Sequence, residues 1–230
     1  MFDLTASELA AIELSLRVGL WSVVGSLLPA LGAAWLLARC DFPGKLVFDG
    51  LVHLPLVVPP VVVGYLLLVL LGRNGPLGQL LDAWFGITVA FTWRGAAVAS
   101  AVMAFPLMVR AMRLSLEAVD RKLEAAARTL GAPPWQVFAT VTLPLMAPGL
   151  LTAAILGFAR SLGEFGATIT FVSNIPGETR TLPLALYTFT QTPDGEAGAL
   201  RLAVVSILLA LVALAGSELL ARRLRKRMAA

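Results

Sequence analysis

Residues 122–145 read "KLEAAARTLGAPPWQVFATVTLPL", a partly charged stretch in a very apolar chain. The alanine-rich run from Leu123 to Leu130 favours a helix, because alanine is the best helix former. Gly131 suits a helix C-terminus, whereas Pro133 and Pro134 cannot continue a helix but can begin a new one. The stretch is therefore predicted to form a helix, a break and a second helix.

The composition of the chain is that of a membrane protein. Its 230 residues are 58% hydrophobic and 14% charged, with a mean hydropathy of +0.85, which is too apolar for an ordinary soluble domain. A helix needs about 20 apolar residues to cross roughly 30 Å of hydrocarbon. The runs of about this length are Leu14–Leu37, Leu51–Leu71, Gly95–Met112, Leu145–Leu162 and Leu202–Leu220. We therefore predict an all-α polytopic membrane protein with about five transmembrane helices.

Other classes of protein fit the sequence less well. The formal charge of +4 lacks the groove-like basic pattern of a protein that binds nucleic acid, so lipid headgroups and topology explain the cations better. A single cysteine, Cys40, excludes an intramolecular disulfide and a thiolate cluster, and Arg39 before it does not suit a lipidation site. Asp3, Glu8 and Glu13 stand where a signal peptide needs a basic region, so the first run is predicted to be a mature span.

The distribution of basic residues predicts the orientation, because lysine and arginine in short loops are retained in the cytoplasm. In the first loop, the third loop and the tail these residues are Arg39, Lys45, Arg110, Arg113, Arg121, Lys122, Arg128, Arg222, Arg223, Arg225, Lys226 and Arg227. The other side keeps Arg17, Arg73, Arg94, Arg180 and Arg201, with acidic residues nearby at Glu13, Asp82, Glu178 and Glu196. We expect the N-terminus outside and the C-terminus in the cytoplasm.

The quoted stretch is then the largest cytoplasmic loop, and Leu143-Pro144 is expected to turn the chain back toward the membrane. Its "WQVF" run supplies Trp135, Val137 and Phe138 for an apolar surface. Two interpretations stay open at this point. One is an amphipathic helix that rests among lipid headgroups, and the other is a short helix held out for a protein partner.

The stretch resembles the EAA loop of permease subunits in importers of the ATP-binding cassette (ABC) class. That family's pattern is Glu-Ala-Ala, three residues, Gly, nine residues, Ile, one residue and Leu-Pro, and its distal half matches from Gly131 to Pro144, with Val141 in place of isoleucine. The Glu-Ala-Ala slot falls on residues 125–127. Glu124 stands one place early, about 100° around a helix, so the family glutamate's salt bridge is not carried over, and Glu124→Gln is expected to be milder than a change at Gly131.

The resemblance implies a set of coupling residues and partners. The residues that it assigns to ATPase coupling are Glu124, Ala125, Ala126, Ala127, Gly131, Trp135, Phe138, Val141, Leu143 and Pro144. In the family this loop is a coupling helix that sits in a cleft of a separate cytoplasmic ATPase. The chain has no G-x-x-x-x-G-K-[ST] phosphate loop, the motif that cradles nucleotide phosphates. ATP and Mg are therefore expected in the partner, and this chain is expected to be non-catalytic and to bind no cofactor.

The same resemblance implies a type I ABC importer architecture. It pairs the chain with a second copy of itself, with ABC ATPase subunits and with an extracytoplasmic binding protein. The expected transmembrane domain is 10–222, with a cytoplasmic coupling loop at 120–144 and a basic cytoplasmic tail at 223–230.

A second resemblance concerns the cargo. "FARSLGEFGATITFVSNIPGETRTLPLALYTFTQT" at 158–192 and "HLPLVVPPVVVGYLLL" at 53–68 resemble permeases of molybdate importers. Sulfate and thiosulfate permeases share "GEFGA", whereas the continuation "NIPGETRTLPLA" at 174–185 favours molybdate. The implied function is a path for molybdate, or tungstate, across a bacterial-type cytoplasmic membrane, with a molybdate-binding protein outside. A sulfate or thiosulfate permease is the alternative.

Candidate path residues surround the same region. Burying Arg160 in lipid would cost roughly 2.5–3.5 kcal/mol, so it should face protein or water, where Glu164 could pair with it as a gate or as a structural ion pair. Hydroxyl groups nearby could meet an anion or could equally satisfy helix backbone. Pro59 and Pro60 inside the second span, and Pro106 inside the third, should kink their helices. The predicted path residues are Pro59, Pro60, Arg160, Ser161, Glu164, Thr168 and Thr170.

Three further functions remain to be distinguished. An intramembrane hydrolase needs a metal motif or a serine with a base, and His53 is the one histidine of the sequence, so no metal site is predicted. A membrane scaffold would need no cavity, and a stand-alone secondary anion transporter would work without an ATPase. Met103, Met108 and Met112 are expected to pack.

Overall fold

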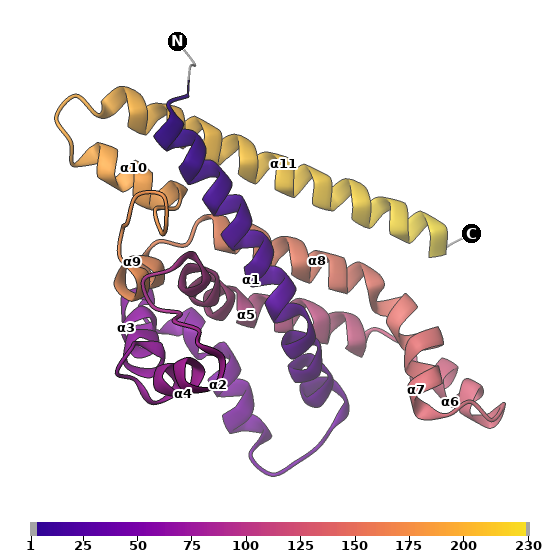
Figure 1. Cartoon of the computed structure of the whole chain (residues 1–230). Coiled ribbons are helices and arrows are strands. Elements are labelled where there is room, and N and C mark those ends of the chain that lie inside the picture. The colour runs from indigo at the N-terminus through magenta and orange to yellow at the C-terminus, as the bar shows by residue number, and fades with distance from the viewer. Residues whose placement is uncertain (1–3, 229–230) are drawn as a thin grey trace.

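The computed structural model describes the backbone of residues 4–228 and the side chains of residues 4–216, so the basic side chains predicted for the tail lie outside the described residues. Every regular element in that range is helical (Figure 1). The helices are α1 (Ala6–Arg39), α2 (Lys45–Val57), α3 (Pro60–Leu71), α4 (Pro76–Phe85), α5 (Trp93–Glu117), α6 (Arg121–Thr129), α7 (Pro134–Val137), the π-helix η1 (Phe138–Thr142), α8 (Leu143–Leu162), α9 (Gly166–Val172), α10 (Leu182–Thr190) and α11 (Glu196–Met228). The all-α prediction is confirmed.

The predicted spans correspond to four continuous helices and one bent pair. The helices long and apolar enough to cross a membrane are Ala6–Arg39, Trp93–Glu117, Pro134–Leu162 and Glu196–Gly216. The second predicted span is divided between α2 and α3, whose axes differ by 114°. Among the described residues there are thus five candidate crossings only if the bent pair counts as one of them.

The proline pair breaks the second span where only a kink was expected. α2 ends at Val57 and α3 begins at Pro60. Val58 and Pro59 have ψ angles of 138° and 133°, because a residue that precedes proline is displaced from the helical region. Pro106 lacks a helical N–H as well, yet α5 continues through it. Two consecutive prolines therefore end a helix in this chain, and a single one does not.

α5 forms the centre of the bundle and packs between α1 and α8. Met108 and Met112 are fully buried in this packing and Met103 is nearly so, which confirms the prediction for these methionines. Ala30 and Ala34 of α1 are also fully buried, and such small residues let membrane helices approach closely.

The bundle has two distinct ends (Figure 1). At one end the fully buried Glu8 at the start of α1 accepts hydrogen bonds from Arg201 of α11, with Oε1 2.8 Å from Nη2 and 3.0 Å from Nε. At the other end the last residue of α1, Arg39, contacts Glu124 of α6. The first loop and the quoted stretch therefore lie on the same side of the bundle.

Candidate coupling surface and translocation path

The predicted helix, break and helix is confirmed in the coupling segment, residues 120–144. Asp120 caps α6, because its side chain accepts a hydrogen bond from the backbone N–H of Lys122 at 2.9 Å. Gly131 follows α6 with φ at +87°, a left-handed conformation that favours glycine. Pro133 is extended and Pro134 opens α7. The break therefore consists of a left-handed residue and two prolines.

The predicted turn at Leu143-Pro144 is wrong. α7, η1 and α8 follow one another without a gap and form one long helix from Pro134 to Leu162. Pro144 has no N–H for an α-helical hydrogen bond, and the π-helix just before it changes the register, so that the N–H of Leu143 bonds to the carbonyl oxygen of Phe138. The chain instead reverses around Gly131.

Glu124 faces the interior of the protein. Its Oε1 accepts hydrogen bonds from Nη2 of Arg39 at 3.1 Å and from Oγ1 of Thr142 at 2.7 Å. Arg39 Nη2 also donates to the carbonyl oxygen of Leu116 at 3.1 Å, at the end of α5. One buried carboxylate thus joins α1, α6 and η1, and through Arg39 it reaches α5.

This geometry gives a physical reason for the register of the motif. A shift of one residue rotates a side chain by about 100° around a helix. Glu124, one place early, is buried, whereas Ala125 and Ala126 are exposed and Ala127 is half-buried. A role for Glu124 in ATPase coupling stays a prediction. Because Glu124 is buried, it would act by positioning the coupling segment and not by contacting the ATPase.

The outward surface of the coupling segment is apolar but differs from the predicted one. Trp135 is 72% exposed, whereas Val137 is buried and Phe138 packs edge-on against Trp35 with ring centroids 5.2 Å apart. Sequence reasoning missed Leu130, which is 89% exposed and lies next to the left-handed glycine. Val141 and Leu143 are half-buried and Pro144 is exposed. Leu130 and Trp135 therefore flank the break as exposed apolar side chains.

The first loop contributes charge to the same end of the bundle. Nζ of Lys45 donates a hydrogen bond to Oδ1 of Asp41 at 3.0 Å. This hydrogen bond and the charge of Lys45, with a smaller contribution from Arg121, hold the pKa of Asp41 below its usual value. Arg39 and Cys40 line one pocket with Arg121 and Glu124 of α6, so the start of the first loop lies beside the coupling segment.

The predicted path residues gather where α8 turns into α9. Arg160 and Glu164 form an ion pair, with Nη1 and Oε2 2.6 Å apart, and Glu164 is buried. The other carboxylate oxygen, Oε1, accepts from the backbone N–H of Ala167 at 2.9 Å, at the start of α9. Gly166 lies directly against Pro60, since a Cβ on Gly166 would be 2.8 Å from the Cβ of Pro60. The break after Pro59 and the start of α9 are therefore in contact.

The hydroxyl groups in this region differ in their partners. Ser161 Oγ bonds to the carbonyl oxygen of Gly157 at 2.8 Å and lies 2.7 Å from Oγ of Ser22. Oγ1 of Thr170 donates to the carbonyl oxygen of Gly166 at 2.9 Å. Thr168 Oγ1, in contrast, is buried with no hydrogen-bond partner among the described residues. Thr168 thus has the one hydroxyl of the three that is free for a ligand.

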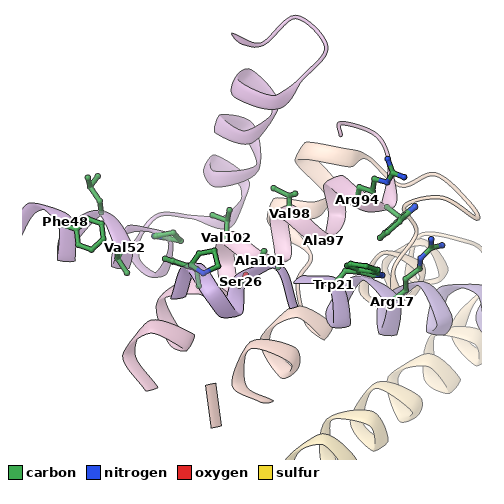
Figure 2. Close-up of a pocket in the computed structure, with 16 residues that line it drawn as sticks. Arg17, Trp21, Ser26, Phe48, Val52, Arg94, Ala97, Val98, Ala101 and Val102 are labelled. Carbon is green, nitrogen blue, oxygen red and sulfur yellow. The ribbon is translucent and has the colours of Figure 1, made fainter. Parts of the chain in front are cut away.

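A groove that sequence reasoning missed lies between α1, α2 and α5 (Figure 2). Arg17 follows Glu13 by one turn of α1, and its guanidinium lies over the Trp93 ring, 3.9 Å from the centroid. Only the adjacent pair "WR" at 93–94, at the beginning of an apolar run, could have indicated this cluster.

Solved structures of ABC importers share this arrangement of helices. The TM-score is 0.72, at 17% identity, with a bacterial ABC transporter involved in the import of the acidic polysaccharide alginate, over 96% of this chain and 80% of that one. It is 0.69, at 16% identity, with the MetNI methionine ABC transporter, over 95% and 94% of the two chains. The fold is that of an ABC importer permease.

The chain belongs to the family described as binding-protein-dependent transport system inner membrane component, which matches residues 30–226. It is 63% identical over 224 residues to the molybdenum transport system permease protein ModB of Escherichia coli (strain K12), covering 97% of this chain and 98% of that protein. It is 58% identical to ModB of Haemophilus influenzae, over 96% of both chains. It is 39% identical to the sulfate transport system permease protein CysW of Synechocystis sp., over 93% of this chain and 77% of that protein.

Membership of this family settles the class of function. The chain is a multi-pass inner-membrane component of a transport system and a non-catalytic subunit. A permease of this kind works with an ATPase and with a substrate-binding protein, as the family description implies.

Proposed function

We propose that this chain is the permease subunit of an ATP-driven molybdate importer, in which two copies enclose the path. The observation that carries this proposal is the 63% identity, over 97% of the chain, to a permease named for molybdenum transport. Tungstate has the same charge and shape and is the second expected cargo. Sulfate is the alternative, because a sulfate permease is 39% identical.

The proposed orientation has the N-terminus outside and the C-terminus in the cytoplasm, with a transmembrane domain at 10–222 and a tail at 223–230. Contact between Arg39 and Glu124 supports a common side for the first loop and the coupling segment. A reporter fused after Thr5 should be external and one fused after Ala230 cytoplasmic. Cytoplasmic signals from both ends would contradict the proposal.

In the proposed mechanism the ATPase binds the exposed side of the coupling segment. Ala125, Ala126, Leu130 and Trp135 are exposed apolar side chains that are available for that contact. Because the helix that begins at Pro134 continues into the membrane, a displacement of the segment would move α8 directly. ATP binding and hydrolysis would then alternate the access of the path between the two sides of the membrane.

The proposed gate lies where α3 meets α9. Arg160 and Glu164 neutralise each other there, and a free hydroxyl can donate to an oxyanion without holding it as tightly as an unpaired cation would. Broken helices line substrate sites in many transporters, which supports a place in the path for the break at Pro59 and Pro60.

The experiment that tests the function reconstitutes the permease with its ATPase and its binding protein in proteoliposomes. Molybdate or tungstate on the binding protein should stimulate ATP hydrolysis and be imported. Stronger stimulation by sulfate would assign the chain to the sulfate branch. Uptake that persists with an inactive ATPase would indicate a secondary transporter.

A further inference from the structure

The groove between α1, α2 and α5 has a volume of about 970 Å³ and a mostly apolar lining (Figure 2). Along α1 it extends from Arg17 to Pro29. Twelve residues of helix correspond to about 18 Å, which is close to half of the roughly 30 Å hydrocarbon thickness. Val98, Ala101 and Val102 of α5 line the middle of the groove, and Val52 of α2 lies toward the end away from the arginines. The groove thus has the length of one leaflet and the polarity of an acyl chain.

The end of the groove near the start of α5 is cationic. The guanidinium of Arg17 lies 3.9 Å and that of Arg94 5.8 Å from the centroid of the Trp93 ring. Trp21 lies beside it, with ring centroids 6.4 Å apart. Tryptophan and arginine together are typical of the level where a membrane protein meets headgroups. In Figure 2 both guanidinium groups lie at this end, away from Phe48 and Val52.

These two cations have no carboxylate partner among the described side chains. Glu13 is one turn before Arg17 but forms no ion pair with it in residues 4–216. Glu178 reaches the start of α5, where its Oε1 accepts from the backbone N–H of Trp93 at 3.2 Å. That carboxylate caps α5 and forms no ion pair with either arginine. The guanidinium groups of Arg17 and Arg94 thus form no direct ion pair among the described side chains and are available for an anionic ligand.

The geometry points to a binding site for an anionic phospholipid, with its phosphate between Arg17 and Arg94 and one acyl chain in the groove. Arginine binds phosphate oxygens with two parallel hydrogen bonds. The apolar lining suits a hydrocarbon chain, whereas a hydrated dianion such as the cargo would lose its water there without compensation. With the orientation proposed above, the lipid belongs to the outer leaflet. The site does not depend on which anion is transported.

A lipid in this position would contact the helix that carries the broken span. The groove is lined by Phe48, Val52 and Pro55 of α2, and α2 ends at Val57. The lipid would therefore hold α2 against α1 and α5 just before the break. Anionic lipid is then expected to stabilise one position of α2 in the assembled transporter.

The experiment measures lipid retention by the assembled transporter in nanodiscs that contain phosphatidylglycerol and phosphatidylcholine. Native mass spectrometry should find phosphatidylglycerol on the wild type and on Arg17→Lys/Arg94→Lys. Retention by Arg17→Gln/Arg94→Gln should fall about tenfold or more, because charge-assisted hydrogen bonds are lost. Arg73→Gln, which removes an exposed arginine that does not line the groove, is the matched control and should retain the lipid.

Several outcomes would overturn the lipid site. Equal retention by all variants, or an equal loss in Arg73→Gln, would show that the two arginines form no specific site. A photo-crosslinking residue in place of Val98 should capture lipid, and capture of a second copy of the chain would show that the groove is a subunit interface. Displacement of phosphatidylglycerol by excess molybdate would show a site for the cargo anion instead.

Discussion

Arg39 at the end of α1 and Glu124 in α6 form an ion pair across 85 residues of sequence, with Nη2 and Oε1 3.1 Å apart. Their side chains are only 9% and 11% exposed. The same oxygen accepts from Thr142, so the carboxylate fixes the coupling segment against the first transmembrane helix. Motion of α6 is thereby tied to α1.

Removal of Glu124 should destabilise the coupling end of the bundle. Glu124→Ala leaves Arg39 buried without its partner, and breaking a buried pair in this way costs about 3 kcal/mol or more. Glu124→Gln keeps an acceptor oxygen and should have an intermediate effect, which replaces the mild effect expected from the motif alone. Thermal unfolding in detergent and co-purification of the ATPase measure both effects.

The matched control for this pair is Glu117→Ala. Glu117 bonds to Arg113 at 2.8 Å, but its side chain is 43% exposed, and such surface pairs contribute less than about 1 kcal/mol. Equal unfolding temperatures for Glu124→Ala and Glu117→Ala would show that the interior carboxylate does not stabilise the segment.

Gly131 should be required for the shape of the coupling segment. Nothing lies within 4 Å of a Cβ placed there, so the cost of Gly131→Val comes from the positive φ alone and is about 1 kcal/mol or more. Because the substitution changes the angle between α6 and α7, it should weaken ATPase binding or uncouple hydrolysis from transport. The transmembrane helices should still insert. Ala126→Asp should act similarly by placing a charge in the proposed contact.

Gly50→Val is the control for Gly131→Val. Gly50 also has open space around its Cβ position, and its φ is not positive, so its variant should bind the ATPase normally. A segment that only rests on lipid headgroups would tolerate both Gly131→Val and Ala126→Asp. Normal uptake, ATPase co-purification and abundance in both variants would therefore refute the coupling role.

Sequence reasoning succeeded where local chemistry determines the structure. Gly131 and the prolines after it predicted the break in the coupling segment, and four of the five long apolar runs correspond to continuous helices. The fifth run, Leu51–Leu71, is divided at its proline pair, where only a kink was expected. Sequence reasoning failed where partners come from distant residues. The position of Arg17 over Trp93 depends on tertiary packing, and the inward direction of Glu124 depends on Arg39. No spacing rule within one segment contains that information.

The contact between α3 and α9 should not tolerate a side chain at Gly64. A Cβ there would be 2.5 Å from the carbonyl oxygen and 2.9 Å from the Cα of Ala167. Backbone atoms cannot move away easily, so Gly64→Ala should cost about 1–3 kcal/mol and separate the proposed gate elements. Transport and thermal stability should both fall, whereas Gly32→Ala, with no atom within 4 Å of its Cβ position, should resemble the wild type. Normal transport by Gly64→Ala would show that close contact between α3 and α9 is not needed for transport.

Thr168 distinguishes a translocation path from purely structural packing. Its Oγ1 is buried and has no partner among the described residues, and an unsatisfied buried hydroxyl is itself destabilising by roughly 1–3 kcal/mol. Thr168→Val keeps the shape of the side chain and removes that hydroxyl, so the variant should be at least as stable as the wild type. If the hydroxyl meets the oxyanion during transport, Thr168→Val should nevertheless slow molybdate uptake several-fold.

Thr170→Val is the comparison, because Oγ1 of Thr170 already donates to the carbonyl oxygen of Gly166 and is not free for an anion. Its loss should affect stability slightly and the rate of uptake little. Uptake by both variants is measured in proteoliposomes that contain equal amounts of assembled transporter. A rate for Thr168→Val equal to that of the wild type, at unchanged stability, would remove Thr168 from the path and leave the α8–α9 turn a structural element.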